Sequence, residues 1–139
     1  MSQYTNSPVG VASVQEAKKD NKKDCKPPIK YIHPDFIEGP AYGMLAGEMK
    51  YGAWNYLNGH NYTDLLDAAI RHLNAVRRGE DIDENCTKIL REGYIRDGQH
   101  IEGFGEKAPK VHHLWLAACN INMILSQMAK GTLKDDREF

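Results

Sequence analysis

The stretch Thr63-Asp64-Leu65-Leu66-Asp67-Ala68-Ala69-Ile70-Arg71-His72-Leu73-Asn74-Ala75-Val76-Arg77-Arg78-Gly79 decides the fold class. Its apolar residues recur every three to four positions, which is the spacing of an amphipathic helix. Asp64 suits the positive first turn, Arg77 and Arg78 suit the negative last turn, and Gly79 is a typical stop. The pattern therefore predicts a helix that is capped by Asn61 or Thr63 and ends near Gly79.

Weaker patterns on both sides of this stretch predict further helices. Residues 35–58 carry an apolar stripe through Leu45, Met49 and Ala53, with a break expected near Gly39-Pro40. A short helix is expected at residues 85–92 and a last one at residues 110–130. The glycines between these two helices indicate a long loop, and no strand pattern is convincing. The predicted fold class is all-α.

Composition limits the domain organisation and the partners. Residues 1–24 are rich in polar residues and end in a charge run, which predicts a disordered tail. Residues 25–131 are expected to form one helical domain, and residues 132–139 a frayed C-terminal tail. The formal net charge is -1, with Lys and Arg spread along the chain, so we expect no binding to a nucleic acid polymer.

The same sequence favours a protein of a reducing compartment. No apolar run is long enough for a membrane span, and the N-terminus lacks the apolar core of a signal peptide. The cysteines are Cys25, Cys86 and Cys119, an odd number without a CxxC pair, which argues against a disulfide framework. We therefore expect a cytoplasmic protein without membrane association.

Several polar residues have a spacing that suits a site, and each also has a simpler interpretation. Asp67 and Arg71 share a helix face, where they form either part of a site or a surface ion pair. His72 lies at the apolar boundary, as a ligand or as a core residue with satisfied hydrogen bonds. Glu80-x-x-Asp83 suits a hard cation if it is helical, and is otherwise an acidic loop. His113 and Asn120 are two helical turns apart and share a face.

Taken in order, these residues resemble a known family. The matching positions are Lys26-Pro27, Gly47, Lys50-Tyr51-Gly52, Asn55-Tyr56, Asp67, Arg71-His72, Gly79-Glu80-Asp81, Asp83, His113, Ala117-Ala118 and Asn120. The set is similar to the phage-type dATP/dGTP diphosphohydrolase N-terminal domain family, whose members resemble the MazG-like nucleotide pyrophosphohydrolases. In three respects the chain departs from the family pattern, the first being Tyr56, which stands where a tryptophan is usual. Leu116 stands where a second histidine is usual, and an insertion precedes the last helix.

The resemblance implies an all-α, MazG-like helical bundle that hydrolyses dATP or dGTP to the monophosphate and pyrophosphate. Its context would be phage remodelling of the nucleotide pool in the cytoplasm of an infected bacterial host. The resemblance implies Mg²⁺ or Mn²⁺ as the cofactor, held by Asp67, Glu80 and Asp83. It implies catalytic roles for His72, Glu80 and His113. It also implies substrate binding by Lys50, Trp54, Asn55, Tyr56, Arg71 and Asn120.

Two other functions fit the same residues. A catalytically inactive nucleotide-binding protein, a sponge or a sensor, would fit Leu116 and the insertion. A helical interaction module would need its polar residues only to satisfy its own core. Pyrophosphate release from dATP or dGTP would separate the hydrolase from both. Because three long helices give a thin core, we also expect a homodimer or a higher homo-oligomer, with facing helices completing the bundle.

Overall fold

The computed structural model describes residue 17 and residues 25–139. The predicted disordered tail, residues 1–24, lies outside the described part of the chain except for Ala17. The described residues belong to two units, divided between Tyr31 and Ile32. In the first unit, Ile29–Tyr31 form an exposed 3₁₀ turn. The second unit, Ile32–Phe139, contains the helical domain.

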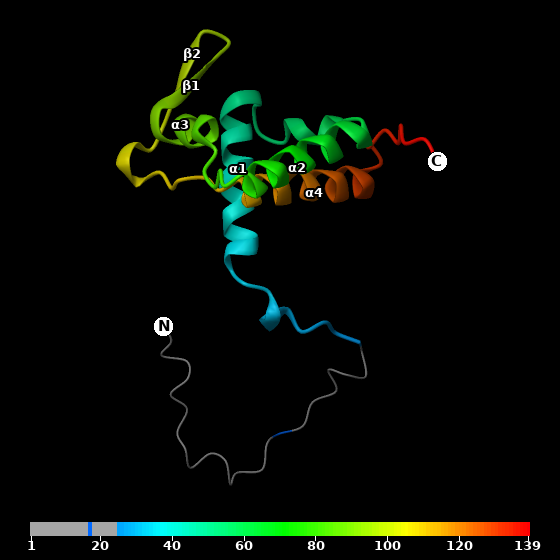
Figure 1. The fold of residues 1–139 in the computed structure, drawn as a ribbon. Coiled ribbons are helices and arrows are strands. Elements are labelled where there is room, and N and C mark those ends of the chain that lie inside the picture. Colours follow the sequence, from blue (N-terminus) through cyan, green and yellow to red (C-terminus); the bar gives the residue numbers. More distant parts are fainter. Residues whose placement is uncertain (1–16, 18–24) are drawn as a thin grey trace, which may run out of the picture. The chain divides into compact units, whose positions relative to one another are not determined.

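The helical domain has four α-helices and one small β-hairpin (Figure 1). The helices are α1 (Asp35–Tyr51), α2 (Tyr62–Arg77), α3 (Glu84–Glu92) and α4 (His113–Lys130). The hairpin strands are β1 (Gly93–Arg96) and β2 (Gln99–Glu102), and short 3₁₀ helices form at Asn55–Asn58 (η4) and Gly105–Lys107 (η5). The predicted all-α class is confirmed. Among the described residues, none of the helices has the length and apolar character needed to cross a bilayer.

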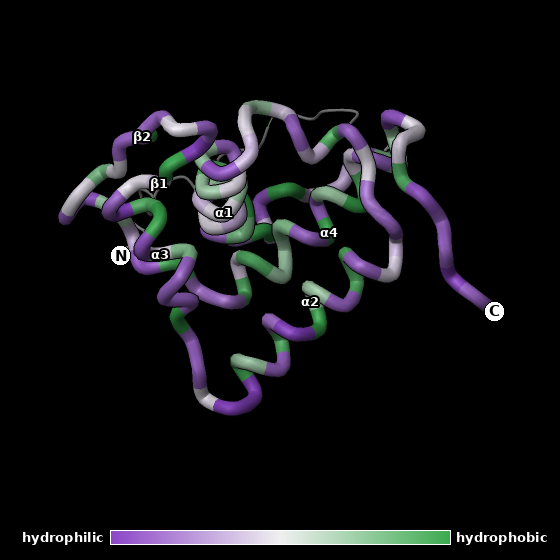
Figure 2. The backbone as a smooth tube through the Cα atoms, turned by 90° about the horizontal axis from the view of Figure 1, so that it is seen from above, coloured by the Kyte–Doolittle hydropathy of each residue, from purple (hydrophilic) through white to green (hydrophobic). Residues whose placement is uncertain are grey.

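Helices α2 and α4 lie side by side, and α1 crosses them steeply, so that Figure 2 shows α1 nearly along its axis. The buried core gathers where α1 meets α3 and the start of α4, around Ala46, Met49, Leu90 and Val111. Leu90 and Val111 are completely buried. This small core fixes α3 against α1, and it thereby places the start of α3 beside the start of α4.

Small residues on α1 allow α4 to approach closely. A Cβ atom added at Gly43 would lie 2.5 Å from Cys119 Sγ, and one at Gly39 would lie 2.5 Å from the Trp115 ring. The Cys119 thiol donates a hydrogen bond to the Pro40 carbonyl at 2.9 Å. Burial raises the pKa of this thiol to about 12, so it stays protonated as a donor.

The first predicted helix differs from the structure in two ways. The break expected near Gly39-Pro40 is wrong, because α1 runs continuously through Pro40. Its end is earlier than predicted: α1 stops at Tyr51, and Gly52 follows with φ of 98°. Residues beyond this point form η4 instead of continuing the helix. The chain therefore turns at Gly52, and the aromatic segment after it becomes a separate 3₁₀ helix.

The region predicted as a long loop contains the β-hairpin. Strands β1 and β2 pair antiparallel, with Arg96 opposite Gln99. The two connecting residues, Asp97 and Gly98, both have positive φ, which is the combination of a type I′ turn. Arg96 Nη1 donates to the Glu48 carbonyl at 2.8 Å, so the hairpin supplies a hydrogen-bond donor to a carbonyl group in the last turn of α1.

The C-terminal tail, predicted to fray, is instead tied to the start of α2. Tyr62 N donates to the Lys134 carbonyl, and Lys134 N donates to the His60 carbonyl. Asp136 accepts hydrogen bonds from the backbone and the hydroxyl of Thr63, and these bonds lower its pKa. Asn61 makes no side-chain capping bond, so Asp136 supplies the cap that was expected from Asn61 or Thr63.

Candidate metal centre and nucleotide pocket

Three side chains from three different elements meet at one point. They are His72 of α2, Asp83 just before α3, and His113 at the first turn of α4. The two Nδ1 atoms lie 2.9 Å apart. Asp83 Oδ2 lies 3.9 Å from His72 Nδ1 and 3.7 Å from His113 Nδ1. All three side chains are less than a quarter exposed, so the cluster is largely shielded from solvent.

Backbone hydrogen bonds bring Asp83 and His113 together. An antiparallel bridge joins Ile82 to His112. It contains two backbone hydrogen bonds of 2.8 Å: Asp83 N donates to the Val111 carbonyl, and His113 N donates to the Asp81 carbonyl. The buried Thr87 hydroxyl supports this bridge, because it accepts from Val111 N and donates to the Asp83 carbonyl. The cluster is therefore assembled by the fold and does not depend on flexible side chains alone.

The Asp83 carboxylate has two separate tasks. Its Oδ1 accepts a hydrogen bond from Cys86 N at 2.8 Å, which caps α3. Its Oδ2 faces the two histidines. The cap therefore fixes the orientation of the carboxylate and leaves one oxygen available to the cluster.

The protonation of His72 follows from its surroundings. Burial lowers its pKa below the ordinary value, and the nearby charges of His113 and Arg71 lower it further. Asp83 acts in the opposite direction but does not outweigh burial. His72 is therefore neutral near pH 7 and keeps a nitrogen lone pair. One of the two rings donates to the other across the Nδ1–Nδ1 contact, in a direction set by the tautomer.

The carboxylates predicted to share a cation are not all brought together. Glu80 is exposed, and its Oε1 lies 3.3 Å from Arg78 Nε. Asp67 is exposed on α2. Among the described residues, only His72, Asp83 and His113 form a group of metal-ligating atoms within 4.8 Å of one another. Of the predicted set Asp67, Glu80 and Asp83, the structure therefore brings only Asp83 into this group, together with two imidazoles.

The two cationic residues predicted to bind substrate, Lys50 and Arg71, have different surroundings. Lys50 is half-buried, and its Nζ lies 5.0 Å from the centre of the Tyr51 ring. Burial raises the pKa of the Cys86 thiol to about 11. The charge of Asp83 raises this pKa further, whereas the charge of Lys50 lowers it. Lys50 therefore lies within electrostatic range of the segment that carries Asp83. Arg71 is exposed next to His72, and within the described chain no ion pair joins it to Asp67.

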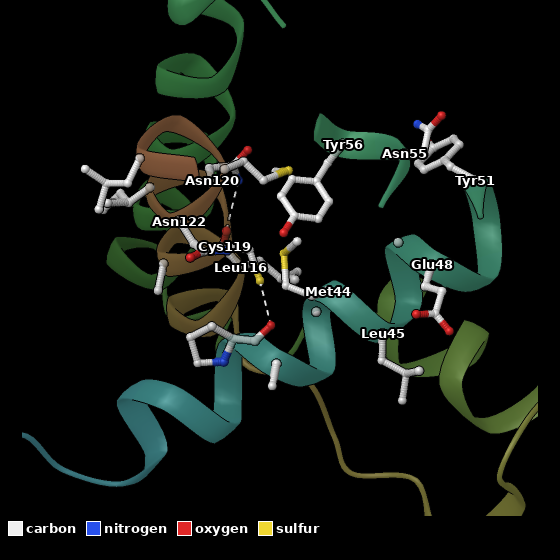
Figure 3. A pocket seen from close by; sticks show the side chains of 18 of the residues that line it. Met44, Leu45, Glu48, Tyr51, Asn55, Tyr56, Leu116, Cys119, Asn120 and Asn122 are labelled. Atoms are coloured by element: carbon white, nitrogen blue, oxygen red, sulfur yellow. Dashed lines mark hydrogen bonds between the residues drawn. The ribbon is translucent and has the colours of Figure 1, made fainter. Parts of the chain in front are cut away.

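An open pocket of about 1090 Å³ lies between α1, η4 and α4 (Figure 3). Its walls are mainly apolar, with Met44 of α1 and Leu116 of α4 among them. In Figure 3 the Tyr56 side chain points into the space between these two helices. His72 also lines the pocket, and this residue connects the pocket to the cluster. The volume suits a small-molecule ligand.

Four of the predicted substrate-binding residues line this pocket: Trp54, Asn55, Tyr56 and Asn120. Trp54 is exposed, and its ring centre lies 6.2 Å from that of Tyr56. Asn120 is buried and donates through Nδ2 to the Leu116 carbonyl at 2.9 Å. Its Oδ1 atom remains available as an acceptor. The structure thus gathers these four residues on one pocket.

Gln127 and His60 are part of the site architecture that sequence reasoning missed. Gln127 is completely buried, accepts from His60 N, and donates to the Tyr56 carbonyl, both at 2.8 Å. Its Nε2 also lies 2.8 Å from His60 Nδ1. These bonds hold η4 on α4. A signal was present, because His113, Asn120 and Gln127 follow one another at seven-residue intervals on one face of the last helix.

Comparison with protein families gives a match over most of the chain. A family model described as "dATP/dGTP diphosphohydrolase, N-terminal" matches residues 16–137. No curated protein and no solved structure matches the chain.

Proposed function

Because the chain belongs to the dATP/dGTP diphosphohydrolase N-terminal family, we propose that it hydrolyses dATP and dGTP to the monophosphate and pyrophosphate. Water would attack the α-phosphorus, and the bond to the bridging oxygen of the β-phosphate would break. Pyrophosphate leaves with that electron pair. One observation carries the proposal: His72 belongs both to the pocket wall and to the cluster with Asp83 and His113.

The pocket supports a division of roles along the substrate. Trp54 and Tyr56 offer aromatic faces on which a purine can stack, and Asn120 Oδ1 can accept from an exocyclic amino group. The triphosphate would then extend toward His72. Arg71 and Lys50 do not line the pocket, but Arg71 acts electrostatically on His72 and Lys50 on Cys86, so both would supply positive charge near that end as donors to phosphate oxygens.

The cluster is the place where the reaction would occur. A divalent cation bound there would neutralise phosphate charge and lower the pKa of the attacking water. His72, Asp83 and His113 offer donors of the right kind, whereas Glu80 points to solvent and pairs with Arg78. The catalytic role expected for Glu80 is therefore transferred to Asp83 in this proposal.

A comparison of two carboxylate variants tests the proposal. Each of the four deoxynucleoside triphosphates is incubated with the protein and Mg²⁺ or Mn²⁺, and the products are separated by chromatography. We expect dAMP and dGMP with pyrophosphate, and ¹⁸O from labelled water in the monophosphate. Asp83→Asn should lower kcat by about 100-fold or more, because it removes a charged group from the reacting site. Glu80→Gln, the matched control, should keep wild-type kcat.

Other outcomes would point elsewhere. Nucleotide binding without pyrophosphate release would favour the inactive binding protein, for which Leu116 in the pocket wall is the relevant observation. No binding of any nucleotide would reject both nucleotide functions. A wild-type rate in Asp83→Asn would remove the cluster from the reaction.

A further inference from the structure

The donor atoms of the cluster are those of a transition-metal site. Ligand atoms bound to one ion at about 2.1 Å lie about 3.0 Å apart at right angles and about 3.4 Å apart in a tetrahedron. The separations among the three atoms are 2.9, 3.7 and 3.9 Å. A shift of the carboxylate by less than about 1 Å would therefore place all three atoms around one ion.

The surroundings of Asp83 and His113 already hold these ligands in position. Cys86 N binds the other carboxylate oxygen of Asp83, which is the kind of supporting hydrogen bond that orients metal-ligating carboxylates. The Ile82–His112 bridge holds the backbones of Asp83 and His113 side by side. A metal ion needs a lone pair on both Nδ1 atoms. The ring that donates in the Nδ1–Nδ1 contact must therefore carry its proton on Nε2 instead.

Two imidazoles and one carboxylate discriminate between cations. Mg²⁺ prefers oxygen ligands and retains its waters, whereas first-row transition metals bind imidazole nitrogen well. We propose that His72 Nδ1, His113 Nδ1 and Asp83 Oδ2 bind one transition-metal ion, such as Mn²⁺, Fe²⁺, Co²⁺ or Zn²⁺, in preference to Mg²⁺. Three protein ligands leave coordination positions open for water or a phosphate oxygen. The role of this ion in hydrolysis, unlike its binding, rests on the proposed function.

Cobalt binding tests the site without any assay of activity. Full-length protein, with its affinity tag removed, is treated with a chelator and titrated with Co²⁺, whose visible absorption reports nitrogen and oxygen ligands. Equilibrium dialysis with metal analysis gives the stoichiometry, expected to be one ion per chain. A tenfold molar excess of Mg²⁺ over Co²⁺ should not displace the Co²⁺.

Matched variants locate the site. Asp83→Asn, which keeps an acceptor for Cys86 N, and His113→Asn should each weaken Co²⁺ binding by about 100-fold. Glu80→Gln and His33→Gln alter exposed residues outside the cluster and should bind like the wild type. Circular dichroism confirms that each variant is folded.

Two results would overturn the proposal: no Co²⁺ binding by the folded wild type, or wild-type affinity in folded Asp83→Asn and His113→Asn. Equal competition by Mg²⁺ would reject the stated preference. The outcome is separable from the proposed function. Metal binding without pyrophosphate release keeps the site and rejects the hydrolase, whereas hydrolysis supported by Mg²⁺ alone, without Co²⁺ binding, does the reverse.

Discussion

Single buried side chains hold the elements that form the pocket in place, and Gln127 is the clearest example. Its amide joins α4 to η4 through the His60 amide and the Tyr56 carbonyl. A buried amide is stable only when its hydrogen bonds are made. Because the amide nitrogen Nε2 can only donate, His60 Nδ1 is the acceptor in the third contact. Gln127 thus positions the aromatic residues without touching the cluster.

We predict that Gln127→Glu destabilises the fold and weakens nucleotide binding. A carboxylate can accept from His60 N, but it cannot donate to the Tyr56 carbonyl, and its charge is buried. An unsatisfied buried group costs about 1–3 kcal/mol, so the urea midpoint should fall accordingly. In the folded variant KM should rise more than kcat falls. Gln99→Glu, an exposed change on β2, is the control, and an unchanged midpoint and KM in Gln127→Glu would refute the role.

At the level of elements, local signals predicted the helices well. Apolar spacing predicts α2, α3 and α4, with Gly79 as the stop of α2, and the structure confirms these helices. The hairpin was missed because its strands are short, although Asp97-Gly98 is a typical two-residue turn.

The site was harder to predict, because it depends on contacts between distant segments. Residues Glu80 and Asp83 were expected to converge if helical, but Asp83 is extended, with φ of -87° and ψ of 105°, and Glu80 turns to solvent. His113 reaches Asp83 through the bridge between Ile82 and His112, which no spacing in the sequence reveals. The types of the site residues were predictable, but their partners were not.

The crossing of α1 and α4 gives a prediction at this scale. Gly43→Ala should destabilise the protein by about 1–2 kcal/mol, because the new methyl group would meet Cys119 Sγ and a Leu116 methyl at 2.5 and 2.8 Å. Gly47→Ala is the matched control on the same helix. A Cβ there meets nothing within 4 Å, so the better helix propensity should raise stability by up to about 1 kcal/mol. Equal effects of both changes in urea denaturation would contradict close packing at Gly43.

At the scale of the whole molecule, the helical domain exposes much of its apolar surface. Phe36 and Ile37 at the start of α1, and Ile121 and Leu125 on α4, are at least half exposed and line the same pocket. Glu48 is the one Asp, Glu, Lys or Arg among the described residues that line it. Extended apolar surfaces of this kind are rare on monomers. A second copy would present the same surface, which is the condition for a two-fold symmetric contact.

We therefore expect the protein to form homodimers through this surface. Light scattering after size exclusion, at micromolar concentration, should give twice the chain mass. The double variant Ile37→Lys, Leu125→Lys should be monomeric, because it places charges on the contact. Ile95→Lys changes an equally exposed residue on the hairpin and should remain dimeric. A monomeric wild type would reject this expectation.

The bridge between Ile82 and His112 also determines when the cluster can form during synthesis of the chain. His113 opens the last helix, so a chain still emerging from the ribosome holds α2 and α3 but lacks one corner of the cluster. Prematurely terminated products have the same defect. Under the proposed function, destruction of nucleotides would begin only after translation has delivered α4, and unfinished copies would leave the precursor supply of the cell untouched.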